Sequence, residues 1–378
     1  MEVKALVLVG GAVEGAAENF AGTPLAVADV LGHSAVYHLV EHLRRQSVTD
    51  VAIISDFPAA SCDRTSRRSA ESQSWMLAPG AQLWRAAETA FNDLAQSGAE
   101  EILVIRVGAY VEPDVDDLLQ AHIENRTHAT RAVDEHGEPM DLLVVTASRR
   151  NEAAYAFRHA LSETRTRCGS WRFRGYANPL RSAQDLRCLA VDAFLGENGI
   201  VPDGIQVRPG VWVARGAAVH PRARVLAPAF IGRRARVRAN AVLTRCSVVE
   251  RHADIGVGTV IEDASVLPFT CVGAGLDVVH AVTGSGRLAS LEHDVEIEIS
   301  DPRLLRSVPY KPGWRALALA ASALSFLLPS PVSQRLARSG RMKSAELPEA
   351  VASPSALHTP AGFPAGTSAV QVSSRTWQ

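Results

Sequence analysis

Residues 207–267 read VRPGVWVARGAAVHPRARVLAPAFIGRRARVRANAVLTRCSVVERHADIGVGTVIEDASVL, and this stretch repeats with a period of six. Every sixth residue is aliphatic: Val207, Val213, Val219, Val225, Ile231, Val237, Leu243, Val249, Ile255, Ile261 and Leu267. A small residue follows four positions after most of them, from Ala217 to Ser265. The pattern is typical of a parallel β-helix, in which the aliphatic side chain fills the interior of each coil. It predicts a left-handed β-helix over residues 201–310, with three hexapeptides per coil and therefore three to four coils.

Upstream, apolar strands alternate with amphipathic helices. The run Val3–Val9 is closed by Gly10-Gly11, which is typical of a parallel strand buried on both faces. The further strands that we expect are 51–54, 102–107 and 142–145, and the helices are 35–45, 81–95, 114–124 and 152–161. This order predicts an α/β domain with a mostly parallel sheet over residues 1–200. Ligands of such sheets bind at the carboxyl ends of the strands.

Composition narrows the functional classes. The 378 residues are 47% hydrophobic and 21% charged, with 39 basic and 40 acidic side chains, so nucleic acid is not an expected partner. All but three of the basic residues are arginine, and no lysine lies between Lys4 and Lys311. The five cysteines form no C-x-x-C pair, and the N-terminus lacks the apolar region of a signal peptide. We therefore expect a cytoplasmic protein.

The C-terminal segment divides in two. Residues 314–328 read WRALALAASALSFLL and predict an apolar or amphipathic helix within 311–340. This helix is short for spanning a bilayer, so we expect it to dock on the protein or a partner subunit, or else to lie at a membrane surface. Residues 341–378 are rich in Pro, Ala, Ser, Thr and Gly, which predicts a disordered tail.

Three arginines coincide with the repeat. Stacking at 18 residues places Arg215, Arg233 and Arg251 in one column, with successive rungs about 4.8 Å apart. One interpretation is a solvated face of a protein that uses arginine instead of lysine. The other is an anion site for a phosphate, an acidic polymer or another subunit.

The order of motifs resembles that of the sugar-nucleotide pyrophosphorylases. The run KALVLVGG (4–11) is similar to the opening strand and glycine-rich loop of this family, and 23–27 and 32–34 resemble its proline-containing segment. Pro79-Gly80-Ala81 falls where the family has a glycine before a helix, and residues 175–186 resemble its closing segment. The resemblance implies a Rossmann-like nucleotidyltransferase domain followed by the β-helix. It also implies that Gly10, Gly11 and Gly80 line a nucleotide site.

The chain departs from this family where the chemistry takes place. The glycine-rich loop has Glu14 where the family has the end of a glycine-threonine-arginine run, and the family's lysine is replaced near Thr23. The two metal-binding aspartates that the resemblance implies correspond to Ala109 and Pro179. We therefore predict no metal ligand, no certain cofactor and no confident catalytic residue.

These departures favour a catalytically degenerate protein of nucleotide-sugar and surface-polysaccharide metabolism. It would bind a nucleotide or nucleotide-sugar through backbone amides and act as a regulatory or scaffold subunit, as a homo-oligomer or with a partner enzyme. One alternative is an active nucleotidyltransferase that holds Mg²⁺ with Asp29, Glu112 or Asp114. The other is a hexapeptide acyltransferase whose general base is His220 or His252.

Overall fold

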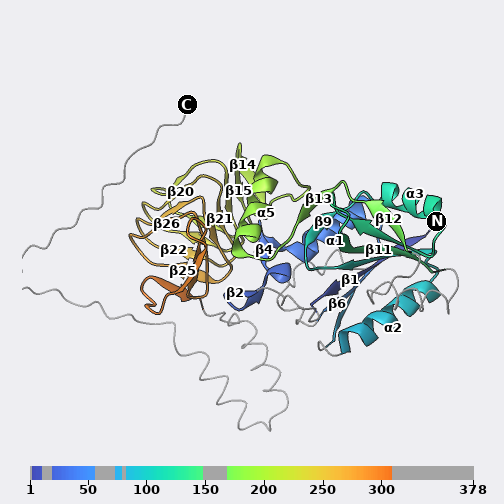
Figure 1. The fold of residues 1–378 in the computed structure, drawn as a ribbon. Coiled ribbons are helices and arrows are strands. Elements are labelled where there is room, and N and C mark those ends of the chain that lie inside the picture. Colours follow the sequence, from blue (N-terminus) through green and yellow to red (C-terminus); the bar gives the residue numbers. More distant parts are fainter. Residues whose placement is uncertain (1, 11–18, 56–72, 79–81, 148–167, 309–378) are drawn as a thin grey trace, which may run out of the picture. The chain divides into compact units, whose positions relative to one another are not determined.

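A computed structural model describes residues 2–10, 19–55, 73–78, 82–147 and 168–308. The N-terminal part is built on a seven-stranded sheet of order β12-β10-β11-β8-β1-β6-β7 (Figure 1). Its strands are β1 (Val3–Val9), β6 (Val51–Ser55), β7 (Gln73–Leu77), β8 (Glu101–Arg106), β10 (Ala129–Val133), β11 (Pro139–Thr146) and β12 (Gly169–Arg172). Only β11 runs antiparallel to its neighbours β8 and β10. The predicted α/β domain with a mostly parallel sheet is confirmed.

Both faces of the sheet are buried. The side chains of β1 alternate between two apolar cores, one on each face. Ala5, Val7 and Val9 belong to one core, and Leu6 and Leu8 to the other. The first core is covered by α1 (Ala35–Arg45), α3 (Val115–Asn125) and α5 (Ala183–Leu195), and the second by α2 (Leu83–Gln96). This explains why the strand reads as a continuous apolar run.

Helices α1, α3 and α5 begin where the sequence supplies a capping side chain. The Ser34 hydroxyl accepts a hydrogen bond from the Tyr37 amide at 3.2 Å, so α1 starts at the predicted residue. Asp114 accepts one from the Asp117 amide at 3.1 Å at the start of α3. Ser182 opens α5 with a capping box that includes Asp185.

Short ribbons connect these layers. They are β2 (Asn19–Phe20) with β3 (Thr23–Pro24), the 3₁₀ turn η1 (Leu25–Val27), β4 (Asp29–Val30) with β5 (His33–Ser34), and β9 (Tyr110–Glu112) with β13 (Tyr176–Asn178). The β9–β13 pair joins segments 66 residues apart and lies next to Ala109 and Pro179, the two positions that the family resemblance singled out.

From residue 205 the chain forms stacked short strands in three sheets, as expected for a β-helix (Figure 1). The first sheet contains β14 (Ile205–Arg208), β15 (Val211–Val213), β18 (Ala229–Ile231), β21 (Ser247–Val249), β24 (Ser265–Val266), β27 (Ala281–Gly284), β28 (Arg287–Ser290) and β29 (Val295–Glu298). The second contains β16 (Ala218–Val219), β19 (Arg236–Val237), β22 (Asp254–Ile255), β25 (Thr270–Val272) and β30 (Leu305–Ser307). The third contains β17 (Arg224–Val225), β20 (Val242–Thr244), β23 (Val260–Glu262) and β26 (Asp277–Val279).

The structure corrects three of the eleven interior positions. Val207 is 54% exposed and lies on β14, which pairs antiparallel with β15, and Val219 is 38% exposed. The 18-residue register ends after Glu262, because Val249 pairs with Val266, 17 residues later. Val266 therefore fills the interior of its coil, and Leu267 belongs instead to the core shared with the α/β domain.

Two predicted helices lie outside the described residues: 152–161 and the segment within 311–340, as does the tail 341–378. In the part of the chain that the structure describes, no helix has both the length and the apolar character needed to cross a membrane.

Candidate functional site

The carboxyl ends of β1 and β8 meet at one edge of the sheet. β1 ends at Val9, followed by Gly10, whose φ of +96° favours glycine. β8 ends beside it at Arg106, because Leu8 pairs with Arg106. The Arg106 guanidinium lies 5.9 Å from the centre of the Trp84 ring at the start of α2. Gly11 and Gly80, the other predicted nucleotide-binding residues, lie outside the described residues.

The β9–β13 ladder brings together Ala109 and Pro179, the positions where the family resemblance implies metal-binding aspartates. Asn178 pairs with Tyr110, so the next positions along the two antiparallel strands are Pro179 and Ala109. Neither side chain has an oxygen that could bind a cation. The Asn178 side chain is buried and used locally: it donates to the Asp185 carbonyl at 3.0 Å and accepts from the Leu180 amide at 3.0 Å.

Thr23, the position of the missing lysine, lies in the β2–β3 ribbon, where it pairs with Phe20 across a turn that contains Gly22. The lysine nearest to it in sequence, Lys4, is buried, and its ammonium pairs with Asp50 at 2.9 Å and Glu2 at 3.1 Å. Lys4 is therefore held within the domain.

Each carboxylate considered as a replacement metal ligand has a structural partner. Asp29 pairs with Arg251 at 2.9 Å. Glu112 accepts hydrogen bonds from the Gly199 amide at 2.9 and 2.8 Å and from the Tyr110 hydroxyl at 2.6 Å. Asp114 caps α3. These bonds leave the three carboxylates poorly placed to bind Mg²⁺.

Sequence reasoning missed one carboxylate at this edge. Asp141 on β11 is exposed and precedes Leu142, which pairs with Ile105 on β8. A β-carbon added at Gly108 would lie 3.8 Å from the Asp141 Oδ2 atom. A lone aspartate near the start of an apolar strand carries no motif, so only the strand register could reveal it. Among the described residues, no three His, Cys, Asp or Glu side chains gather as a metal site.

The backbone positions of Arg215, Arg233 and Arg251 lie on successive coils, as the 18-residue spacing predicts. The Arg234 amide donates to the Arg215 carbonyl, and the His252 amide to the Arg233 carbonyl, one coil later in each case. Arg233 lies 3.6 Å from Asp203, and Arg251 pairs with Asp29, whereas Arg215 is exposed. Carboxylates from the preceding segments thus meet two of the three charges, and binding of an outside anion stays a prediction.

Beside Arg251 lies a second buried carboxyl group. Glu250 is 1% exposed, and its Oε2 atom accepts a hydrogen bond from the Gly32 amide at 3.0 Å. Burial raises the pKa of Glu250 well above its usual range, and the negative charge of Asp29 raises it further. Only glycine fits at Gly32, because a β-carbon there would lie 2.7 Å from that of Asp203.

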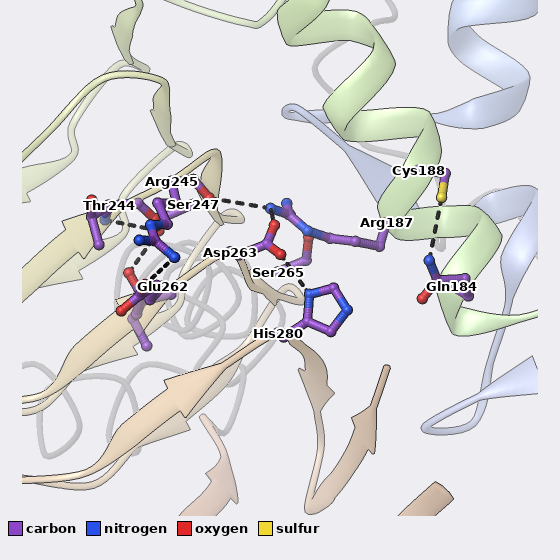
Figure 2. A network of polar contacts seen from close by, with 11 residues as sticks. Gln184, Arg187, Cys188, Thr244, Arg245, Ser247, Glu262, Asp263, Ser265 and His280 are labelled. Carbon is purple, nitrogen blue, oxygen red and sulfur yellow. Dashed lines mark hydrogen bonds and ion pairs between the residues drawn. The ribbon is translucent and has the colours of Figure 1, made fainter. Parts of the chain in front are cut away.

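A polar cluster of Arg187, Asp263, Ser265 and His280 joins α5 to the β-helix (Figure 2). The buried Arg187 side chain donates to the Asp263 carboxylate at 2.7 Å and to the Ser265 hydroxyl at 3.2 Å. The other Asp263 oxygen pairs with His280 Nδ1 at 2.5 Å. Burial raises the pKa of Asp263, but its bonds to Arg187 and His280 outweigh this and hold the pKa below its usual value.

The two histidines of the acyl-transfer alternative, His220 and His252, lie in different surroundings on the coils. His220 is exposed, and its Nδ1 atom accepts from the Arg222 amide at 3.1 Å. The His252 ring stacks on Phe269, with ring centres 4.8 Å apart. The Asp263–His280 pair was not expected, because the two residues come together only where the β-helix coils are 17 residues long.

A cleft of about 300 Å³ opens at the start of α5. Phe20 and Leu25 form its apolar side, Arg181 lies at the helix, and Asp294 and Glu296 come from the hairpin of β28 and β29. Both signs of charge are therefore present at this cleft.

Comparison with protein-family models and with curated proteins gave no match.

Proposed function

We propose that this protein is a nucleotidyltransferase-like protein that binds a nucleotide or nucleotide-sugar without a metal ion and does not turn it over. The resemblance to sugar-nucleotide pyrophosphorylases supplies the ligand class. The observation that carries the loss of turnover is the β9–β13 register, which brings Ala109 and Pro179 to the same place. Its role would then be regulatory or architectural in nucleotide-sugar metabolism.

The chemistry explains why these substitutions matter. In a pyrophosphorylase, a sugar phosphate oxygen attacks the α-phosphate of a nucleoside triphosphate. That reaction depends on Mg²⁺, held by carboxylates, to neutralise the phosphates and align the attack. Removing one preorganised charge-stabilising group costs about 10²- to 10³-fold in rate. A site that lacks both carboxylates and the lysine retains too little of this stabilisation for useful turnover.

Binding a phosphate requires fewer charged side chains than catalysing its transfer. Backbone amides after a buried strand can hold phosphate without a side-chain charge, and Gly10 has the backbone conformation that such a turn uses. Arg106 and Trp84 place a positive charge and an aromatic ring at the same edge of the sheet. These groups favour an anionic, ring-containing ligand.

Calorimetric titration of the full chain with nucleoside triphosphates and nucleotide-sugars, with Mg²⁺ or with a chelator, tests the proposal. We expect binding of one nucleotide or nucleotide-sugar that is unchanged by the chelator. Exchange of labelled pyrophosphate into the triphosphate is expected to be absent. Mg²⁺-dependent exchange would overturn the proposal, as would the absence of any binding.

The double variant A109D/P179D sharpens this test, with A109N/P179N as the uncharged control. If the two positions correspond to metal ligands, the aspartates make triphosphate binding depend on Mg²⁺, and the asparagines do so far less.

An active enzyme with rearranged ligands is the second candidate, and Asp141 is the observation that favours it. Its carboxylate lies near Gly108, immediately before Ala109. In that case pyrophosphate exchange would occur and the Asp141→Asn variant would abolish it, while Asp116→Asn, on α3, would leave it unchanged.

A further inference from the structure

Charge is distributed very unevenly along the β-helix. Between residues 204 and 249 there are nine arginines and no acidic residue, whereas 250–308 hold ten acidic residues and four arginines. Within the part of the chain that the structure describes, three of these arginines have ion-pair partners: Arg233, Arg238 and Arg245. The first coils therefore carry a strong positive charge, and the last coils are acidic.

The two ends also carry the outer strands of the largest sheet. In its order β14-β15-β18-β21-β24-β27-β28-β29, β14 is one edge and β29 the other. All four residues of each edge strand are exposed. Ile205 and Val207 on β14 are 73% and 54% exposed, and Val295 and Ile297 on β29 are each 48% exposed. Exposed apolar edge strands are a template for pairing with another chain.

The charges on the two edges are opposite. β14 ends in Arg208, while β29 alternates its aliphatic residues with Glu296 and Glu298. Among the described residues, the ion-pair partner of Glu296 is the distant Arg287 of its own hairpin, at 3.7 Å. The third sheet repeats this complementarity, because its first strand has the exposed Arg224 and its last strand the exposed Asp277.

Strand directions permit the sheet to continue into a second copy. β28 runs antiparallel to β27, β29 runs antiparallel to β28, and β14 runs antiparallel to β15. The strands from β15 to β27 are parallel to one another. If a second copy stacks in the same orientation, its β14 therefore meets β29 antiparallel, which is the more stable pairing.

We propose that copies of this chain associate head to tail, with the β14 edge of one copy on the β29 edge of the next. The occupant of each edge is a second copy of this chain, selected by opposite charge and matching aliphatic residues. A bulge between Gln206 and Arg208 shortens the usable part of β14, so charge contributes much of the affinity. Such an interface is heterologous and forms rings or filaments.

Sedimentation velocity of the full chain over a range of concentrations tests this proposal. We expect the sedimentation coefficient to rise with concentration at low salt and the association to weaken as NaCl increases. The Arg208→Glu variant and the E296R/E298R variant should each bind themselves at least about tenfold more weakly, because like charges then meet. Arg236→Glu, an exposed charge change away from both edges, serves as the control and should associate like the wild type.

Mixing the two charge-reversed variants distinguishes pairing of β14 with β29 from other modes of self-association. An equal mixture of R208E and E296R/E298R restores association, because each edge then meets an opposite charge on the other variant. The triple variant R208E/E296R/E298R should also associate. A wild-type chain that stays monomeric would overturn the proposal, as would unimpaired self-association of R208E. Loss of polyanion binding in R208E, with a monomeric wild type, would instead assign the basic coils to an acidic polymer.

Discussion

Glu250 and Asp29 place two carboxyl groups side by side in the buried contact between the β4–β5 ribbon and the β-helix. A Glu in water has a pKa of about 4.3, and in the folded protein this pKa is raised. Between those two values the folded state holds one proton more than the unfolded state. Folding stability contributed by this residue is therefore lost as the pH rises through that window.

We expect the Glu250→Gln variant to lose this pH dependence. Its amide oxygen can still accept from Gly32, and it carries no charge to repel Asp29. Urea unfolding at pH 5 and pH 8 should show a smaller difference for the variant than for the wild type, whose slope from this group reaches at most about 1.4 kcal/mol per pH unit. Glu197→Gln, an exposed change away from both proposed edges, is the control. An unaltered pH dependence in the Glu250 variant would contradict the prediction.

At the scale of single elements, the interaction between α5 and the β-helix depends on Arg187. Its side chain is 3% exposed and binds Asp263, which is 35% exposed. Arg187→Met leaves that carboxylate without its main partner. We expect a loss of about 2–3 kcal/mol in the free energy of unfolding, below the full value of a buried pair because Asp263 reaches solvent. Gln184→Met, on the exposed face of α5, should change stability by less than about 0.5 kcal/mol.

The coils of the β-helix provide a second test at this scale. Leu243 and Val219 occupy the same position of the repeat, but Leu243 is fully buried and Val219 is 38% exposed. Leu243→Ala should cost about 2–5 kcal/mol, since it opens a cavity inside a coil. Val219→Ala should cost less than about 1 kcal/mol. Equal losses in thermal or urea unfolding would mean that the first coil is as closed as the later ones.

For the whole molecule, one apolar core joins the α/β domain to the coils. It includes Leu39 and Leu186 from the helices as well as Phe230 and Val248 from the β-helix. We expect calorimetry of residues 1–310 to show a single unfolding transition. Residues 1–200 alone should not unfold cooperatively, because Phe230 and Glu250 are then missing from their contacts with the β4–β5 ribbon. Two separate transitions in the longer chain would show that the parts fold independently.

Local sequence signals predicted the elements well. α1 was predicted to the residue, because Ser34 caps it and its apolar positions recur at helical spacing. The β-helix followed from the six-residue period. The contact of Asp29 with Arg251 could not be predicted, because it joins residues 222 positions apart with no motif at either end.

The candidate site was predicted only through the family resemblance. That resemblance selected Ala109 and Pro179, and the β9–β13 register placed them together. Asp141 went unnoticed since its position depends on strand register. The shift to 17-residue coils was hidden because Leu267 is aliphatic and so satisfied the pattern while contributing to a different core.

That shift of register has a genetic consequence. The interior residues Ile261 and Val266 are five positions apart instead of six, so the gene has one codon fewer here and each later interior position comes one residue earlier than the six-residue period predicts. Here the change leaves Val266 inside and Leu267 outside, where a β-carbon at Gly284 would touch both Leu267 and Ala21 of the α/β domain. Inserting one codon between Glu262 and Ser265 should give an 18-residue coil with Val266 still inside and Leu267 still outside, so the attachment depends on the Leu267 side chain and not on the length of the coil.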